Sequence, residues 1–301
     1  MRKLIVVAVV GLLAQLVDGA LGMGYGVTSS SLLVAVAALS PAAASASVHL
    51  SEMGTNIASG ISHWRLKNVD WRVVARIALP GAIGSFVGAG VLSSLSTEAA
   101  EPVMCGILLA LGVYIFIRFL IGIKPRLRGT PGLKLLAPLG LFAGFVDATG
   151  GGGWGPVATP ALLTDGRMEP RKVIGSIDTA EFVVSAAASL GFILALGSQG
   201  IYWGLALVLL IGGVIAAPIA AYLVRIAPAH LLGIAVAGII LLTNSRTLLK
   251  AADAASGARW AVYIGLFAVT VAGLVFVTLR NRRKNADTAD ADDRLDETVS
   301  A

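Results

Sequence analysis

The run Gly150–Gly153, followed by Trp-Gly-Pro, is the feature that most limits how this chain folds. It lies between two apolar segments in which a helix is expected. Four consecutive glycines and a proline do not sustain an α-helix, because glycine loses the most backbone freedom on folding and proline lacks an amide donor. The sequence therefore predicts a helix that is broken inside an apolar region, over residues 147–156.

A related stretch occurs earlier in the chain, over residues 18–26. A constant shift of 129 residues, the interval from Asp18 to Asp147, aligns the two stretches without a gap. The same shift also aligns Pro41 with Pro170, Ser47 with Ser176, and Glu52 with Glu181. We therefore predict two homologous repeats, each with one glycine-broken helix, which in transporters indicates a binding site where the repeats meet.

Composition places both repeats in a membrane. Hydrophobic residues make up 56% of the chain and charged residues 13%, whereas soluble domains carry about a quarter of charged residues. The sequence thus predicts an all-α polytopic membrane protein in contact with lipid. Basic residues do not cluster with aromatic ones, so we expect no nucleic-acid partner. No HExxH or Walker A motif occurs, and we expect neither an enzyme, nor a cofactor, nor a metal site.

The apolar runs and polar connections divide the chain into five segments. Each repeat is predicted to contain a broken helical hairpin, with limbs too short for the about 20 residues that span a bilayer, and then three transmembrane helices. The segments are a first repeat (1–123), a basic cytoplasmic linker (124–133), a second repeat (134–250), one extra transmembrane helix (251–279) and a disordered polar cytoplasmic tail (280–301).

Lysine and arginine are unevenly shared between the two sides of this topology. Sixteen of them lie in the loops that we place in the cytoplasm, and five lie on the other side. This asymmetry follows the positive-inside rule. A hairpin and three spans carry each repeat from one face to the other, so the repeats are predicted to be inverted. If the short limbs do not form hairpins, the repeats are parallel.

Four ionisable residues lie inside apolar runs. His49 and Glu52 belong to the third helix of the first repeat, and Asp178 and Glu181 occupy the equivalent positions of the second. A spacing of three places each pair on one helix face. A carboxylate at the middle of a bilayer costs about 2.5 to 3.5 kcal/mol on insertion scales, so such residues usually have a function. We expect a proton or ion relay; the alternative is that they lie near span ends or join helices by hydrogen bonds.

Two aspartates sit just before the predicted breaks. Asp18 and Asp147 can accept hydrogen bonds from loop amides, or cap the helix that follows. Either role brings a carboxylate close to the exposed backbone of the break. The residues that we predict to couple transport to protons are Asp18, His49, Glu52, Asp147, Asp178 and Glu181.

The amides that the glycine stretches leave free are expected to meet a substrate. At the start of a helix several N–H groups and the positive end of the dipole point the same way, which attracts an anion without a nearby lysine. Tyr25 and Trp154 either wall this site or pack as ordinary buried aromatics. The predicted substrate-binding residues are Gly24, Tyr25, Gly26, Ser29, Asn56, Gly153, Trp154, Gly155 and Thr179.

These motifs resemble the TauE/SafE family of sulfite and organosulfonate exporters. The resemblance covers about residues 4–250 and rests on Asp18–Gly26, Pro41–Asn56, Leu79–Gly88, Gly144–Pro156, Arg171–Glu181 and Gly212–Ala217. It implies a multi-pass permease of the bacterial inner membrane that carries small sulfur-containing anions such as sulfite.

Three hypotheses about function follow. The first is a secondary transporter that exports such an anion with protons as the coupling ion. The second keeps the architecture but carries a divalent cation, because His49, Glu52, Asp178 and Glu181 are suitable ligands for a metal. The third is an assembly factor that transports nothing. The sequence also leaves open whether the chain forms a homo-oligomer.

Overall fold

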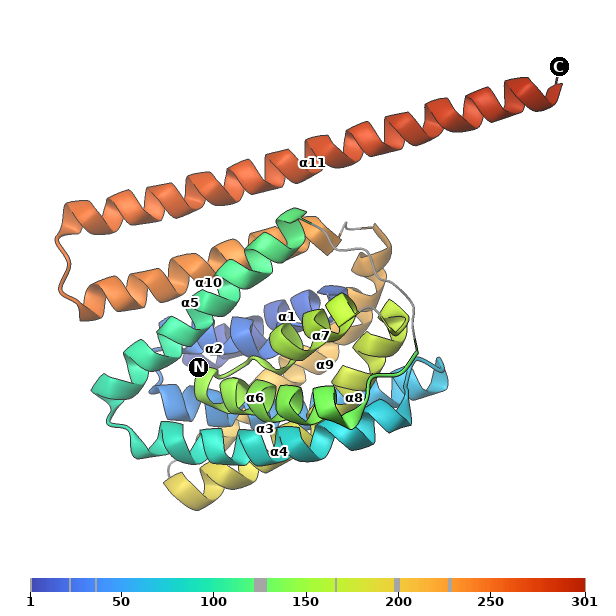
Figure 1. Cartoon of the computed structure of the whole chain (residues 1–301). Coiled ribbons are helices and arrows are strands. Elements are labelled where there is room, and N and C mark those ends of the chain that lie inside the picture. The colour runs from blue at the N-terminus through green and yellow to red at the C-terminus, as the bar shows by residue number, and fades with distance from the viewer. Residues whose placement is uncertain are drawn as a thin grey trace.

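The structure, a computed structural model, describes residues 2–21, 23–35, 37–121, 129–165, 167–197, 201–226 and 229–300. In these ranges the regular structure is helical and no strand is present. Figure 1 shows α1 to α10 gathered in one bundle, with α11 along its outside. The helices are α1 (Arg2–Leu21), α2 (Tyr25–Ala35), α3 (Pro41–Arg65), α4 (Trp71–Ser94), α5 (Thr97–Ile121), α6 (Leu133–Gly150), α7 (Trp154–Asp165), α8 (Pro170–Leu196), α9 (Trp203–Ile226), α10 (Ala229–Ala251) and α11 (Ser256–Ser300).

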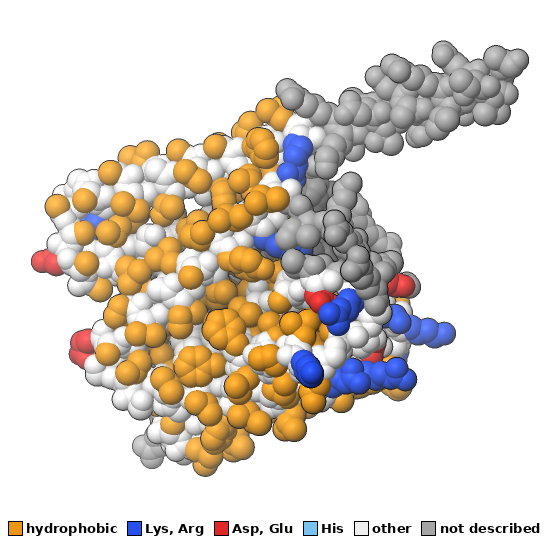
Figure 2. Space-filling view, viewed as in Figure 1, with side chains coloured by type: hydrophobic (Ala, Val, Ile, Leu, Met, Phe, Trp, Pro, Cys, Tyr) orange, Lys and Arg blue, Asp and Glu red, His pale blue; other side chains and the backbone are white. Residues whose placement is uncertain are grey.

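The multi-pass, all-α membrane fold is confirmed. Figure 2 shows apolar side chains over the visible flank of the bundle and basic ones gathered mainly at one end. α3 is as long as α5, 25 residues, but is too polar to count as a span; most of its described polar residues, from Ser45 to Asn56, are buried among other helices. Within the described residues, the helices long and apolar enough to cross a membrane are Trp71–Ser94, Thr97–Ile121, Leu133–Gly150, Lys172–Leu196, Gly233–Ala251 and Ser256–Arg280.

The second break is shorter than the sequence predicts. α6 continues through Asp147 to Gly150, and α7 begins at Trp154. The helix ends where Gly151 takes a left-handed φ of 68°, and Gly152 follows with a φ of 147°. Both conformations are ones that residues with side chains rarely adopt. The predicted limits 147–156 were therefore too wide, because a helix continues through an aspartate and small residues until a left-handed residue stops it.

The first break differs from its prediction in the same way. α1 runs past Asp18 to Leu21, and α2 begins at Tyr25, directly after Gly24 with its φ of 117°. The first limbs α1 and α6 are therefore 20 and 18 residues long, longer than predicted, whereas the second limbs α2 and α7 have 11 and 12. Each hairpin combines one long and one short limb.

Close contacts at glycines show the direction in which the second hairpin enters the bundle. A Cβ added at Gly140 of α6 would lie 2.6 Å from the carbonyl oxygen of Ile77, and one at Gly88, further along α4, would lie 2.7 Å from that of Phe145. α6 therefore runs parallel to α4 at backbone-to-backbone distance. Such close approach of membrane helices needs small residues at the contact.

The first hairpin enters from the opposite end. A Cβ at Gly11 of α1 would lie 2.5 Å from the carbonyl oxygen of Leu209, and one at Gly213 would lie 3.5 Å from Oε1 of Gln15, so α1 is parallel to α9. α4 and α8 begin at the same face, where the amide of Asp70 donates to Ser176. α9 follows α8 after a short connection and so begins at the other face. The homology of the two halves stays a prediction.

Replacing Gly84 with leucine is expected to separate α4 from α6. A Cβ at Gly84 would collide with the carbonyl oxygen of Leu141, whereas one at Gly90, on the same helix, meets nothing within 4 Å. Overpacking of this kind costs about 1 to 3 kcal/mol or more. Thermal unfolding of the purified protein in detergent should show a Tm well below that of the wild type for Gly84→Leu and a Tm close to that of the wild type for Gly90→Leu. Equal Tm values for the two variants would contradict the packing described.

The extra helix α11 packs against α10. Nη1 of Arg280 donates to the carbonyl oxygen of Leu120 at 2.6 Å, which places this part of α11 beside the end of α5. Beyond Arg280, α11 continues to Ser300; the disordered cytoplasmic tail stays a prediction. Extending an existing helix avoids the unfavourable nucleation step, so a polar sequence can follow an apolar one in helical form. The first half of the linker, 124–128, lies outside the described residues. Directly after it, the amide of Gly129 donates to the carbonyl oxygen of Arg167 at 2.8 Å.

Candidate transport site

The two glycine breaks touch each other in the interior of the bundle. A Cβ added at Gly26 would lie 2.6 Å from Cα of Gly152, and one at Gly152 would collide with the backbone nitrogen of Val27. The hydroxyl of Ser30 donates to the carbonyl oxygen of Gly151 and so bonds α2 to the second break. Backbone meets backbone at this contact, which leaves no space between the two breaks at Gly26 and Gly152.

Asp147 caps the helix that follows the second break. Its Oδ1 accepts hydrogen bonds from the amides of Gly153 and Trp154, at 2.8 and 3.0 Å. In the first hairpin, Oδ1 of Asp18 accepts from the amide of Tyr25 at 3.3 Å. Amides that we expected to be free thus already bind a negative group, and that group belongs to the chain itself. A carboxylate at this position satisfies N–H groups that no helical carbonyl reaches and lies at the positive end of the α7 dipole.

A buried cluster of ionisable side chains lies against this contact. Nδ1 of His49 is 3.0 Å from Oε2 of Glu52 and 3.8 Å from Oδ2 of Asp147. Ser185 on α8 donates to the same Glu52 oxygen at 3.3 Å. All three ionisable residues are at most 1% exposed. Burial of an unpaired charge is expensive, so these three groups depend on one another for compensation.

The cluster reaches the first break as well as the second. A Cβ on Gly26 would lie 3.0 Å from Oε1 of Glu52. Nε2 of His49 has no hydrogen-bond partner among the described residues, and the imidazole stacks on Phe192 at a centroid distance of 6.1 Å. His49, Glu52 and Asp147 are therefore brought together from α3 and α6 at the place where both breaks meet.

The ionisable pair of the second half is arranged differently. Oδ2 of Asp178 lies 3.8 Å from Nε2 of His63 on α3. Glu181 lies on the same helix as Asp178 and within electrostatic range of Glu52 and Asp18. His63 was missed because the sequence predicts that its helix ends near residue 61, whereas α3 continues to Arg65.

A spacing pattern in the sequence marks the residues that were missed. Polar residues recur on α3 at alternating intervals of three and four, which places them on one helix face. This face meets α8, where the partners of Glu52 and His63 are Ser185 and Asp178. The recurring residues are His49, Glu52, Asn56, Ser59 and His63.

The four proposed cation ligands do not form a metal site. Across the described parts of the chain, no three His, Cys, Asp or Glu side chains gather as ligands of one ion would. His49 and Glu52 lie at the break contact, and Asp178 pairs with His63. The geometry gives the divalent-cation hypothesis no support.

The predicted substrate-binding residues fall into two places. Gly24, Gly26, Gly153 and Gly155 are buried in or beside the breaks, as is Ser29 on the first turns of α2. Asn56 and Thr179 instead line a separate, mostly apolar cavity of about 440 Å³ between α3, α4 and α8, together with Trp64 and Phe182. The structure therefore does not bring Asn56 and Thr179 together with the glycines.

The two aromatic residues are held by hydrogen bonds. The hydroxyl of Tyr25 and the Oγ of Ser51 are 2.6 Å apart. Nε1 of Trp154 donates to the carbonyl oxygen of Ile177 at 2.9 Å, and the Trp154 side chain is fully buried. Both residues fix the first turn of a short limb against the helix that follows it, which is the packing role that we considered as the alternative.

Comparison with known proteins decides the family. Residues 7–247 match the family described as "Sulfite exporter TauE/SafE". The chain belongs to the TauE/SafE family. One relative, the "Probable membrane transporter protein YtnM" of Bacillus subtilis (strain 168), is 47% identical over 288 residues, which cover 95% of this chain and 96% of the relative. No solved structure matches. This TauE/SafE protein is accordingly a multi-pass membrane transporter and not an enzyme.

Proposed function

We propose that this transporter carries a small sulfur-containing oxyanion, such as sulfite or an organosulfonate, together with protons. The observation that supports this most is the position of His49, Glu52 and Asp147 at the contact between the two glycine breaks. Proton-binding groups and the start of a broken helix are the elements that a proton-coupled anion carrier needs.

In this mechanism the anion replaces the carboxylate of Asp147. The amides of Gly153 and Trp154 now donate to Asp147, and an incoming oxyanion would accept the same two hydrogen bonds. Two negative groups cannot share a buried helix start at low cost. The displaced carboxylate therefore takes up a proton from the neighbouring His49–Glu52 pair, and the pair regains a proton from the solution on the side from which the anion comes. Anion and proton are bound together, and their fluxes have the same direction.

Opening of the site requires the hairpins to part. The contact of Gly26 with Gly152 closes the path between the two faces, and parting would break the bond from Ser30 to Gly151. Thr28 and Ser29 carry buried hydroxyl groups that have no hydrogen-bond partner among the described residues. Such groups are costly unless a ligand or water satisfies them, and they lie on α2 beside the break. Because anion and proton move in the same direction, export requires that the outward concentration gradient of the anion exceeds the inward driving force on the proton.

Uptake of radiolabelled sulfite into proteoliposomes tests this function. The buffer should be alkaline enough to keep sulfite ionised, so that sulfur dioxide does not cross the lipid. Uptake into vesicles with the protein is expected to exceed that into protein-free vesicles and to accelerate when the interior is made more alkaline than the exterior. If sulfite, sulfoacetate and taurine are all left untransported with and without the pH gradient, the proposal is wrong.

A further inference from the structure

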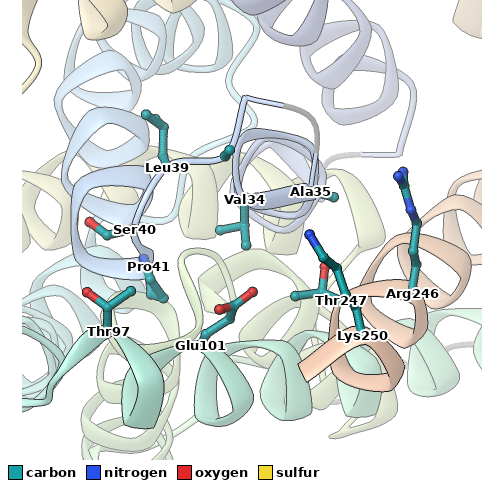
Figure 3. A pocket seen from close by; sticks show the side chains of 11 residues that line it. Val34, Ala35, Leu39, Ser40, Pro41, Thr97, Glu101, Arg246, Thr247 and Lys250 are labelled. Atoms are coloured by element: carbon teal, nitrogen blue, oxygen red, sulfur yellow. The ribbon is translucent and has the colours of Figure 1, made fainter. Parts of the chain in front are cut away.

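A polar cavity of about 420 Å³ opens at the far end of α2 from its glycine break. It lies between the end of α2, the starts of α3 and α5, and the end of α10 (Figure 3). We call it the outer vestibule, because it lies at the face opposite the basic loops. Its polar lining is formed by Ser40, Thr97, Glu101, Arg246, Thr247 and Lys250.

Two basic side chains line one side of the outer vestibule. Arg246 and Lys250 are one turn apart on α10, and Glu101 projects from α5 toward the cavity from below (Figure 3). In the described parts of the chain, no carboxylate lies within ion-pair distance of either base. Only five of the lysines and arginines fall on this side of the topology. Two of these five basic residues, Arg246 and Lys250, lie in one cavity. The positive-inside rule does not explain them, because it disfavours basic residues on this side of the membrane.

The helix ends around the cavity carry opposite partial charges, because α3 and α5 begin there while α2 and α10 end there, so its attraction for anions rests on Arg246 and Lys250. The first turns of α3 and α5, at Pro41 and Thr97, open onto it, and the start of a helix carries partial positive charge. The cavity holds the volume of about fourteen water molecules. Such a space accepts a partly hydrated oxyanion or a small organosulfonate.

Packed side chains separate the outer vestibule from the second break. One turn below the cavity, Nδ2 of Asn244 on α10 donates to the hydroxyl of Ser31 on α2 at 2.9 Å. Met104, one turn along α5 from Glu101, is fully buried, and its methyl group lies against Gly151. α2, α5 and α10 thus converge on the break, with a hydrogen bond and one flexible side chain in the way.

We propose that the outer vestibule is a binding site for small oxyanions at the mouth of the transport path, with Arg246 and Lys250 as its anion-binding groups. Asn244, Ser31 and Met104 close the path between this site and the glycine breaks. The identity of the anion rests on the proposed function, whereas the existence of the site does not.

The site is tested by anion-dependent stabilisation of the full chain in detergent. Sodium sulfite is compared with sodium chloride at equal ionic strength, and Tm is measured for the wild type, for Arg246→Gln with Lys250→Gln, and for Arg259→Gln. Arg259 lies on the same face but does not line the cavity. A ligand that binds the folded state raises Tm, so we expect sulfite to raise Tm in the wild type and in Arg259→Gln, and to raise it clearly less in the double variant, which keeps only the binding at the glycine breaks.

Two outcomes would overturn the proposal. One is that sulfite raises Tm equally in the wild type and the double variant, or in neither. The other is that the double variant lowers Tm by the same amount in both salts, because then Arg246 and Lys250 only complement the negative end of α10.

Transport kinetics separate this proposal from the proposed function. With substrate supplied at the vestibule face, the double variant should raise KM for sulfite about tenfold, the effect of a lost charged contact of about 1.4 kcal/mol. Glu101→Gln should lower KM. An unchanged KM in a transporting protein contradicts the vestibule, whereas a wild type that binds sulfite through Arg246 and Lys250 but transports no sulfur anion contradicts the proposed function alone.

Discussion

Glu52→Gln is expected to abolish transport driven by a pH gradient. Glutamine keeps the shape of the side chain and its hydrogen bond with Ser185, but it cannot pass a proton to His49, 3.0 Å away. The coupled rate should fall at least about 100-fold, because the cluster loses a proton-carrying group. Initial rates of sulfite uptake into proteoliposomes with an alkaline interior measure this effect.

Exchange of sulfite across the membrane is the control for Glu52→Gln. Exchange of internal for external anion needs no net proton release, so it should persist in the variant and show that the protein is folded. Glu98→Gln, at the exposed start of α5, should keep both activities. A Glu52→Gln protein that still responds to the pH gradient like the wild type would remove Glu52 from the mechanism.

Gly152→Ala is expected to prevent the two breaks from meeting. The φ of 147° is unfavourable for alanine, and the added Cβ would collide with the backbone at Gly26 and Val27. Backbone strain costs about 1 to 3 kcal/mol, and the collision adds the cost of moving one hairpin. We expect a protein that is poorly folded or has a greatly lowered Tm. The measurements are thermal unfolding and the yield of monodisperse protein.

Gly129→Ala separates backbone strain from collision. Gly129 also has a left-handed φ, 102°, but a Cβ there meets nothing within 4 Å. This variant should therefore lose little more than the cost of the backbone conformation, about 1 kcal/mol. If Gly152→Ala is as stable as Gly129→Ala, the breaks do not touch in the folded protein.

That His49, Glu52 and Asp147 lie near the breaks could be predicted from the sequence, because chemistry and spacing occur together there. Glycine runs at a constant shift marked the two breaks, and the interval of three between His49 and Glu52 placed both on one face. Asp147 was also identified, although its two roles could not be distinguished. Its hydrogen bonds to Gly153 and Trp154 depend on α6 continuing through the aspartate to Gly150, which helix propensity does not fix to within a few residues.

Contacts between distant segments could not be predicted. His63 pairs with Asp178, more than a hundred residues away, and Glu101 shares a cavity with Arg246 and Lys250. A single sequence does not indicate which residues from distant segments lie close together in the fold. The direct contact of Gly26 with Gly152 could not be predicted either. Two glycine-rich turns have the same sequence pattern whether they touch or lie apart.

The central claim is that an oxyanion accepts the two amide hydrogen bonds that Asp147 now accepts, while the cluster of His49, Glu52 and Asp147 takes up a proton. The most direct measurement is the pH inside proteoliposomes, read by a trapped fluorescent dye, when sulfoacetate is added outside without a pH gradient. Sulfoacetate is fully ionised and does not cross lipid unaided. The account predicts that the interior acidifies as sulfoacetate enters with the wild type, and not with Glu52→Gln. Entry of sulfoacetate at an unchanged internal pH would contradict it.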